Sequence, residues 1–444
     1  MAATDPRQVI DNSPMSMRQW IVVILMVLLN ALDGFDVLSS AFASPGISKE
    51  WGIPRSELGL VLSAELVGMG FGSVLLGGVA DRYGRKLTML ACLVIMAGGM
   101  FLASIADAVT PMVAFRFLTG IGIGGMLAAT NAVTAESSNS QWRKTAIGAY
   151  VAGYPLGAII GGIAASEWLL PDFGWRSVFE FGAIVTAILI PIVMLVMPET
   201  AAYQASKENL TGVNKTLAAF GKPAIDALPP AVAKSAKPKV TDILSNPKLR
   251  PVTLLLAFGY MFHTITFYYI LKFAVQIVAD YPPGYPPNVA ATVLTWANVG
   301  GFLGSLLFGF IMARLGVRWP TALMLLIGAV AVAAFGMGRE TLSGWQWATI
   351  ITGFFTNAAI SGYYAAFARG FPAHARATGT GFVLGVGRLG AAGSPIIAGA
   401  LFTWLGNDQL LTVSIIMAMG SIASLVLFLM LPERDGDDVM AGRA

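Results

Sequence analysis

The chain has 444 residues, of which 56% are hydrophobic and 12% charged, and its formal net charge is +4. Soluble domains carry about a quarter charged residues, so this composition excludes an ordinary soluble enzyme, a disordered chain and a nucleic-acid-binding protein. One cysteine, Cys92, and two histidines, His263 and His374, cannot form an intrachain disulfide or a zinc site built on Cys or His. The composition indicates a polytopic membrane protein for which we expect no metal and no cofactor.

Twelve apolar runs are long enough to cross a bilayer as helices, which takes about 20 residues. Only helices and closed barrels satisfy their backbone in lipid, and these runs are too long for barrel strands. In chain order, the runs cover residues 20–42, 57–80, 87–106, 112–136, 145–167, 175–197, 252–278, 290–312, 320–338, 345–368, 378–403 and 410–431. The first run exceeds the core of a signal peptide, so we expect it to remain in the protein.

Lysine and arginine residues divide unevenly between the two sides of these runs. Twenty-one of the 28 fall on the side of both termini and four on the opposite side, while Arg116, Lys272 and Arg388 lie within runs. Cytoplasmic loops carry the excess of Lys and Arg. The distribution predicts that both termini lie in the cytoplasm, and we expect the protein to lie in a bacterial inner membrane.

A basic, proline-rich stretch separates the first six runs from the last six. It is either a regulatory or lipid-binding loop or a solvated linker, and its composition favours the linker. We therefore predict an N-terminal six-helix half at 1–199, a cytoplasmic linker at 200–250 and a C-terminal six-helix half at 251–444.

An internal repeat relates the two halves. The segments Gly72–Lys86 (GSVLLGGVADRYGRK) and Gly304–Arg318 (GSLLFGFIMARLGVR) share six of fifteen residues without gaps. Parallel repeats are one architecture of secondary transporters, with the substrate site near the midplane between them. The predicted fold is an all-α membrane protein with twelve transmembrane helices in two pseudo-symmetric six-helix halves.

Three motifs resemble the major facilitator superfamily. Gly77–Lys86 (GGVADRYGRK) resembles its signature loop between helices 2 and 3, and Arg116–Gly120 and Pro198–Thr200 resemble its helix-4 and helix-6 motifs. The second copy of the signature has lost its acidic and one basic residue, so the first copy is the better candidate for a latch. The resemblance implies a cytoplasmic gate that contains Gly77, Asp81, Arg82, Gly84, Arg85 and Lys86.

Within this gate, Gly84 allows a tight turn. Asp81 can meet a helix end or an arginine of the other half. Without the resemblance, the loop is only a basic loop on the cytoplasmic side.

A narrower resemblance is to the aromatic acid:proton symporters of this superfamily. It rests on Asp33-Gly34-Phe35-Asp36 in the first run, Glu136 at the end of the fourth, and Gly387-Arg388-Leu389-Gly390-Ala391 in the eleventh. The resemblance implies proton-coupled uptake of benzoate-like or hydroxybenzoate-like anions by alternating access. The expected partners are a small organic anion, protons and the lipid bilayer, with no nucleic acid, and we expect a monomer.

Four charged residues are candidates for proton coupling: Asp33, Asp36, Arg116 and Glu136. Asp33 and Asp36 are three residues apart and share one helix face. Two carboxylates this close in a low dielectric resist double ionisation, so at least one readily takes a proton. The pair could instead serve only as an internal ion pair with Arg116, and Glu136 is better placed for a gate salt bridge. The sequence does not decide which aspartate carries the proton.

The remaining intramembrane cations are candidates for binding the anion. The guanidinium fork of Arg388 matches a carboxylate, although it could also brace an internal acid. Lys272 either holds the anion or extends to the interface, and Glu65 is a further candidate for the polar interior. Aromatic side chains are expected to form a platform for the planar ring of the substrate. Any single one of them could instead pack only against other helices or lipid. The candidates are Tyr150, Tyr154, Tyr260, Phe267, Tyr268, Trp296, Tyr363 and Tyr364. Of these, Tyr154, Tyr268, Trp296 and Tyr364 are our candidates for substrate contact.

Alternative functions remain at this point. A carrier or exporter of other organic acids or drugs in the same superfamily is the nearest, and a transporter-like receptor is another. We expect no enzyme, because the sequence contains neither a phosphate-binding loop nor a nucleophile–base arrangement. His263 is best interpreted as an interior histidine with satisfied hydrogen bonds.

Overall fold

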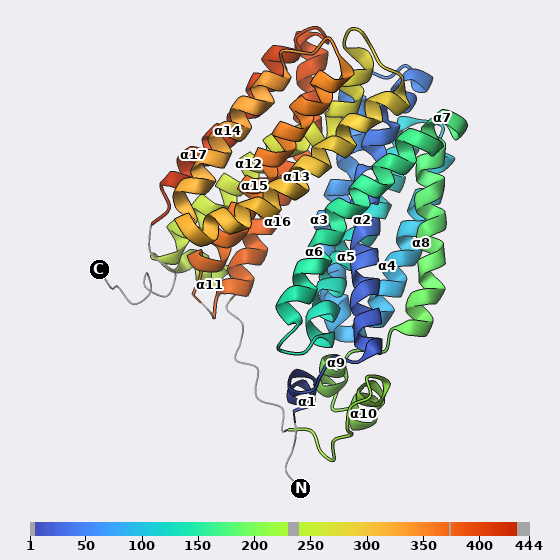
Figure 1. Ribbon diagram of the computed structural model, residues 1–444, viewed down its shortest axis with the longest axis vertical. Coiled ribbons are helices and arrows are strands. Elements are labelled where there is room, and N and C mark those ends of the chain that lie inside the picture. The colour runs from blue at the N-terminus through green and yellow to red at the C-terminus, as the bar shows by residue number, and fades with distance from the viewer. Residues whose placement is uncertain (1–4, 230–238, 373, 433–444) are drawn as a thin grey trace. The chain divides into compact units, whose positions relative to one another are not determined.

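The computed structural model describes residues 5–229, 239–372 and 374–432, and within those residues it contains helices and no strands (Figure 1). Each predicted run corresponds to one long helix, which confirms the all-α fold and gives twelve long helices within the described residues. These helices are α2 (Met17–Trp51), α3 (Arg55–Tyr83), α4 (Arg85–Ser104), α5 (Val109–Ser137), α6 (Arg143–Ala164), α8 (Arg176–Val196), α12 (Leu249–Asp280), α13 (Pro287–Leu315), α14 (Arg318–Phe335), α15 (Leu342–Gly370), α16 (Arg376–Leu405) and α17 (Leu410–Leu429). Shorter elements are α1 (Pro6–Asn12), η1 (Ala165–Leu169), α7 (Leu170–Phe173), α9 (Ala201–Ser206), α10 (Leu210–Ala219) and α11 (Val240–Ser245).

The helix α2 is longer than its apolar run predicts. It continues past residue 42 to Trp51 and ends before Gly52, whose φ is +61°. Two serines at and before this extension satisfy their hydroxyl groups on the helix itself, because Ser39 and Ser44 donate to the carbonyls of Asp36 and Ala41. Such serines lower the hydropathy of the sequence, but they are compatible with a buried helix because their hydroxyl groups are hydrogen bonded.

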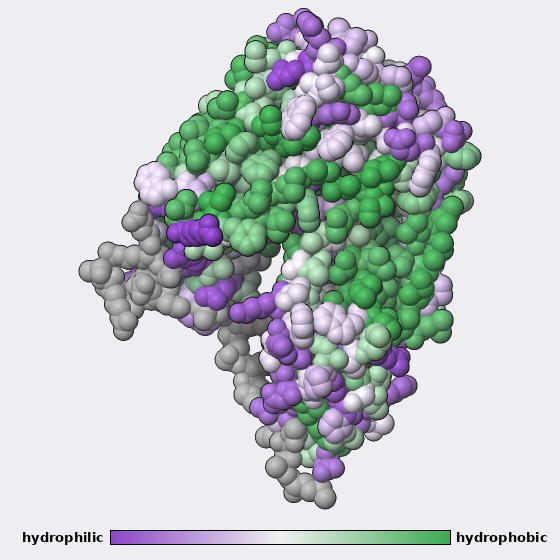
Figure 2. Space-filling model, viewed as in Figure 1, coloured by the Kyte–Doolittle hydropathy of each residue, from purple (hydrophilic) through white to green (hydrophobic). Residues whose placement is uncertain are grey.

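Large hydrophobic side chains are exposed along the outer surfaces of the long helices. Examples are Ile160, Leu195, Phe310, Val330 and Val426. On the face shown in Figure 2, hydrophobic side chains cover the middle of the helices and hydrophilic ones gather at the helix ends. Within the described residues, eleven helices are long and apolar enough to cross a membrane, and α15 is as long but more polar. The chain is therefore a multi-pass membrane protein.

The chain packs as two compact units. Unit 1 consists of the described parts of 1–39, 68–161 and 176–234. In it α4 packs against α5 and α8. Unit 2 consists of the described parts of 40–67, 162–175 and 235–444. In it α12 packs against α16 and α17, and α13 against α15. This division by packing leaves the three sequence domains, 1–199, 200–250 and 251–444, a prediction.

The two copies of the internal repeat occupy equivalent positions in the fold. Gly84 follows the end of α3 with φ +106°, and Gly316 follows the end of α13 with φ +78°. Two residues later, Lys86 donates to the carbonyl of Met194, and Arg318 donates to the carbonyls of Leu429 and Leu431. In both copies a basic side chain therefore binds the carboxyl end of a neighbouring helix, where carbonyl groups lack partners within their own helix.

Glycines set the contact between α2 and α6 in unit 1. A Cβ atom added to Gly157 would overlap the carbonyl group of Ala31, and one added to Gly153 would meet the carbonyl oxygen of Val27 at 2.6 Å. On the other helix, Gly34 lies directly against the carbonyl group of Tyr154. The two backbones approach this closely because no side chain stands between them.

Replacing Gly157 by alanine is expected to lower the stability of the folded protein. The added methyl group has no space against Ala31, and overpacking of this kind costs about 1–3 kcal/mol. Gly148→Ala is the matched control on the same helix, because nothing lies within 4 Å of its Cβ position. We expect the thermal unfolding midpoint in detergent to fall for Gly157→Ala and to stay or rise for Gly148→Ala. Equal shifts in the two variants would contradict this packing argument.

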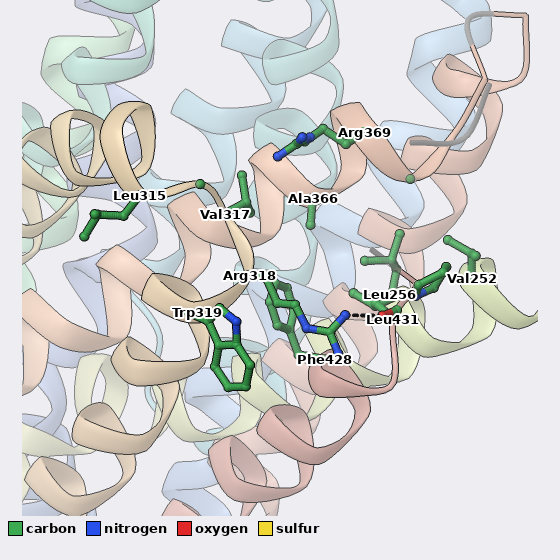
Figure 3. A pocket seen from close by; sticks show the side chains of 13 residues that line it. Val252, Leu256, Leu315, Val317, Arg318, Trp319, Ala366, Arg369, Phe428 and Leu431 are labelled. Carbon is green, nitrogen blue, oxygen red and sulfur yellow. Dashed lines mark hydrogen bonds between the residues drawn. The ribbon is translucent and has the colours of Figure 1, made fainter. Parts of the chain in front are cut away.

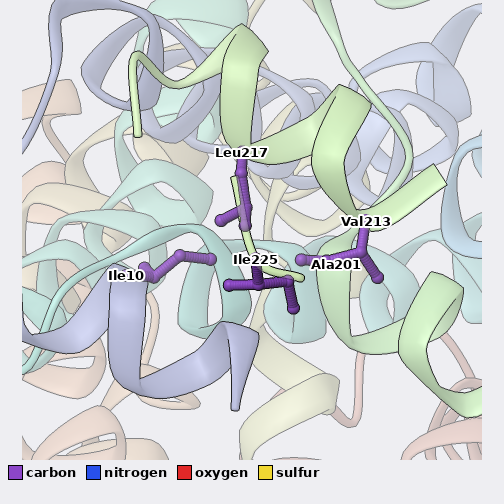
Figure 4. Close-up of a cluster of buried hydrophobic side chains, with 5 residues drawn as sticks. All are labelled: Ile10, Ala201, Val213, Leu217 and Ile225. Carbon is purple, nitrogen blue, oxygen red and sulfur yellow. The ribbon is translucent and has the colours of Figure 1, made fainter. Parts of the chain in front are cut away.

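The first part of the predicted linker is folded. The short helices α9 and α10 pack with α1 around a buried cluster of Ile10, Ala201, Val213, Leu217 and Ile225 (Figure 4). The side chains of Arg7 and Arg143 both pair with Asp11 on α1, and Arg7 also donates to the carbonyls of Glu136 and Ser138. This assembly, which we name the tail module, ties the amino-terminal segment to the end of α5 and the start of α6.

Candidate functional site

Two acidic side chains lie in the interior of unit 1. Asp33 and Asp36 on α2 are both 0% exposed, and none of their four carboxylate oxygens has a hydrogen-bond partner among the described residues. The carboxylate of Asp36 faces α8, where a Cβ atom added to Gly182 would lie 3.0 Å from Oδ1. A buried carboxylate without hydrogen bonds is costly, so this acid pair needs a functional explanation.

Arg116 on α5 brings a cation to the same place. Its guanidinium donates to the main-chain carbonyl of Asp36 at 2.8 Å and to the sulfur of Met100 at 2.8 Å. It also lies over the ring of Phe179, 5.2 Å from the centroid, and is 0% exposed. The structure therefore brings together three of the four residues predicted for proton coupling. Tyr154 lies beside them on α6, with its carbonyl group against Gly34 between the two aspartates.

The fourth, Glu136, lies apart from the acid pair and belongs to a network at the turn between α3 and α4. The guanidinium of Arg85 pairs with Glu136 and with Asp81, each at 3.2 Å. The same side chain donates to the carbonyl of Ala80 at 3.1 Å. The network thus links α3 and α4 to the end of α5 within unit 1.

Glu199 completes this network from the end of α8. Its carboxylate accepts from the main-chain N–H groups of Arg85 and Lys86, at 3.1 and 3.2 Å. An acid at a helix N-terminus satisfies N–H groups that have no partner in the helix and is favoured by the helix dipole. A side chain on Gly84 would overlap the Glu199 carboxylate, so this turn requires glycine both for its positive φ and for space.

The remaining signature residues contribute less specific contacts. The hydroxyl of Tyr203 donates to the main-chain carbonyl of Arg82. The guanidinium of Arg82 lies over the ring of Tyr83. Nothing lies within 4 Å of the Cβ position at Gly77. Pro198-Glu199-Thr200 stood out in the sequence as a motif, but its contact with the signature loop could not be predicted because the two are over a hundred residues apart.

A second polar centre lies in unit 2, where Arg388 on α16 lies close enough to tyrosines of α12 to act on them electrostatically, and one of these tyrosines contacts Tyr364 of α15. The positive charge of Arg388 acts on the hydroxyl groups of Tyr260 and Tyr268. The hydroxyls of Tyr260 and Tyr364 are hydrogen bonded, and their ring centroids are 6.2 Å apart. We name Arg388, Tyr260, Tyr268 and Tyr364 the arginine–tyrosine cluster.

Glycines beside Arg388 hold α16 close to α12. A Cβ atom on Gly387 would overlap the ring of Tyr260, and one on Gly390 would overlap the carbonyl of Met261. The hydroxyl of Thr264 donates to the carbonyl of Gly387 at 2.9 Å. Because of this packing, one face of α12 lies toward the segment that carries Arg388. Tyr260, Thr264 and Tyr268 follow one another on that face at four-residue spacing.

The cluster combines a guanidinium with phenol hydroxyls and aromatic rings. A guanidinium can bind a carboxylate through two parallel hydrogen bonds. Aromatic rings add edge or face contacts to a planar ligand, worth about 0.5–1.5 kcal/mol each. Arg388, Tyr268 and Tyr364 were predicted from the sequence, whereas Tyr260 was only one of several aromatic residues considered.

The other predicted residues of unit 2 lie elsewhere. Lys272 is fully buried on α12 and pairs with Glu65 of α3. Trp296 on α13 is 41% exposed. His263 is buried, with Nδ1 2.9 Å from the hydroxyl of Ser421 and Nε2 2.9 Å from the carbonyl of Thr356. These contacts confirm the interpretation of His263 as an interior histidine with satisfied hydrogen bonds.

A cavity of about 350 Å³ opens between α12, α14, α15 and α17 (Figure 3). It is lined by apolar side chains such as Leu256 and Phe428 and by the arginines Arg318 and Arg369. None of its lining residues belongs to the acid pair or to the arginine–tyrosine cluster. The cavity is therefore distinct from both polar centres.

Comparisons with known proteins agree with this architecture. Residues 23–285 match the model of the Major Facilitator Superfamily. The 4-hydroxybenzoate transporter PcaK of Acinetobacter baylyi is 28% identical, covering 96% of this chain and 94% of that protein. The gallate transporter of Pseudomonas putida is 29% identical, covering 94% of this chain and 96% of that protein.

A solved structure has the same fold. It is a bacterial homologue of the human lysosomal transporter Spinster, with a TM-score of 0.70 at 17% identity, covering 93% of this chain and 95% of that one. The match of the family model over more than half of the chain, together with the twelve helices and the paired signature turns, shows that this chain belongs to the Major Facilitator Superfamily.

Proposed function

We propose that this protein is a secondary transporter that takes up aromatic carboxylates together with protons by alternating access. In this proposal it lies in a bacterial inner membrane with both termini in the cytoplasm, as the distribution of Lys and Arg favours. Its two six-helix halves, 1–199 and 251–444, alternate in exposing the substrate site. The linker at 200–250 joins them.

The observation that carries the substrate class is the arginine–tyrosine cluster. An aromatic carboxylate that leaves water needs a counter-charge for its carboxylate and an apolar, planar surface for its ring. Arg388 offers the first, and Tyr260, Tyr268 and Tyr364 offer the second together with hydroxyl groups. The names of the relatives, a 4-hydroxybenzoate and a gallate transporter, support the same class.

The acid pair supports proton coupling. Asp33 and Asp36 are buried without hydrogen-bond partners among the described residues, next to the guanidinium of Arg116. Loading one proton removes a buried negative charge, and releasing it restores an attraction to Arg116. A change of this kind biases helix packing around α2, α5 and α8, which is what a proton-driven carrier requires.

The network at the α3–α4 turn supports a gate on the cytoplasmic side. Arg85 joins Asp81 and Glu136, and Glu199 holds the N-terminus of α4. We propose that this network keeps the cytoplasmic ends of α3, α4, α5 and α8 together as one rigid group while the carrier opens and closes. Glu136 therefore acts in the gate rather than in carrying the proton.

Uptake by the purified protein in liposomes tests the proposal. Labelled 4-hydroxybenzoate, gallate and benzoate are offered with and without an inward proton gradient, and shikimate serves as the non-aromatic acid. We expect accumulation of at least one aromatic acid that depends on the gradient and collapses with a protonophore. Accumulation of none of them, or accumulation unaffected by the gradient, would overturn the proposal, and proton-driven movement in the opposite direction would favour an exporter.

A further inference from the structure

An ion pair of Glu65 and Lys272 lies in the interior of unit 2, away from the acid pair. The Nζ of Lys272 donates to Oε1 of Glu65, and both side chains are 0% exposed. Glu65 comes from α3 and Lys272 from α12, so the pair joins segments that precede and follow the linker. A buried pair of this kind is stable only while both members stay together, because either one alone is an uncompensated buried charge.

The first part of α3 is held against α12 and α16 within unit 2 by further contacts around this pair. A Cβ atom on Gly59 would overlap the carbonyl of Pro395, and one on Gly399 would overlap the carbonyl of Arg55. The guanidinium of Arg55 pairs with Asp280 at 3.2 Å and lies over the ring of Phe402, 4.3 Å from its centroid. These contacts close the ends of α3, α12 and α16 that, in the proposed topology, face the outside.

Lys272 also lies on the face of α12 that leads to the arginine–tyrosine cluster. Tyr260, Thr264, Tyr268 and Lys272 follow one another at intervals of four residues, so each shares a face with the next and together they form a stripe that winds slowly around α12. One such interval is about 6 Å along the helix axis. Tyr268 is thus the next residue of the stripe after Lys272, and it interacts electrostatically with Arg388.

Alternating access, the mechanism proposed above, requires the outward-facing ends of α3 and α12 to separate. Separation removes Glu65 from Lys272 and leaves a cation that needs a new counter-ion. The incoming substrate carries a carboxylate of the same charge and geometry as the Glu65 side chain.

We propose that Glu65 and the substrate carboxylate are alternative counter-ions of Lys272. In the open state Lys272 receives the incoming carboxylate at the entrance of the stripe. On closure Glu65 returns to Lys272 and displaces the substrate, which passes the ring of Tyr268 to Arg388. This inference rests on the proposed function and adds an entry site and its competing internal acid.

Four variants test the exchange, with 4-hydroxybenzoate and gallate as probes of uptake. Lys272→Met removes the entry cation, and we expect the KM for uptake to rise about tenfold. Glu65→Gln removes the competing acid, and we expect a lower KM together with a lower maximal rate, because closure no longer displaces the substrate. The double variant Glu65→Gln/Lys272→Met leaves no buried charge, so we expect its thermal unfolding midpoint to recover toward wild type while its KM stays raised. Asp280→Asn is the matched control, because it breaks the other ion pair between α3 and α12 and should leave KM within about twofold.

The double variant separates exchange from a purely structural brace. If the pair only holds the helices together, removing both charges restores KM along with stability, and the exchange proposal is overturned while the proposed function stands. A Glu65→Gln variant with an unchanged or higher KM would overturn it as well. Failure of the wild-type protein to take up either carboxylate would overturn the proposed function and the exchange together.

Discussion

Replacing Asp33 or Asp36 by asparagine is expected to abolish accumulation of substrate against a gradient. Asparagine has the shape of aspartate but cannot carry a proton, so the variant loses the link between the proton gradient and transport. A pH difference of one unit is worth about 1.4 kcal/mol and supports about tenfold accumulation for one coupled proton. We expect this accumulation to fall to the equilibrium ratio in a coupling-deficient variant.

The measurement compares net accumulation with exchange of labelled for unlabelled substrate in the same liposomes. A variant that has lost only coupling still exchanges substrate, because the arginine–tyrosine cluster in unit 2 is intact. Asp107→Asn is a suitable control, since Asp107 is an exposed residue in the turn between α4 and α5 of the same unit. Wild-type accumulation in both Asp33→Asn and Asp36→Asn would exclude the acid pair from coupling, and a loss in only one would identify the proton carrier.

The sequence predicted the helices well because the length of an apolar run is a local property. Each of the twelve predicted runs corresponds to a long helix. The turn at Gly84 was predictable for the same reason, since a glycine between two helices indicates a positive φ. The main error in length, at the end of α2, arose because the extension contains polar and helix-breaking residues that lower its apparent hydropathy, namely Ser44, Pro45, Ser48, Lys49 and Glu50.

Pairing between distant residues could not be predicted in the same way. Glu65 and Lys272 are 207 positions apart, and no feature near either residue indicates the other. Glu199 likewise contacts the start of α4 from 114 positions away. Sequence reasoning identified Glu65 and Lys272 as unusual because each lies in an apolar run, and it identified Glu199 only as part of a motif. It could not decide which charges meet.

The tail module was not predicted from the sequence, although the sequence contains a pattern that indicates one of its helices. Val213 and Leu217 are four residues apart on α10 and share one face, which is typical of a short amphipathic helix. The prolines and lysines of the region favoured a solvated linker instead. A helix of ten residues buries its apolar face only when a partner is supplied, and here the partner is Ile10 on α1, far away in the chain.

Removing the guanidinium of Arg388 is expected to weaken substrate binding by about 10- to 100-fold. This range corresponds to the net loss of about one hydrogen bond to a charged group, worth about 1.5–3 kcal/mol, because water replaces part of the contact that the fork makes to the carboxylate. Arg388→Lys keeps the charge but loses the fork, so we expect an intermediate loss. The measurement is the dissociation constant of 4-hydroxybenzoate, gallate or benzoate for the purified protein.

Arg376→Ala is the matched control for this variant, because it removes an exposed arginine from the first residue of the same helix. A similar loss in both variants would mean that the general positive charge of α16 attracts the anion and that no specific contact exists at Arg388. Unchanged affinity in Arg388→Ala, with a lowered unfolding midpoint, would instead make Arg388 a brace for the tyrosines of α12. An affinity loss confined to Arg388, with Lys intermediate between Arg and Ala, is the pattern that only direct recognition of the carboxylate produces.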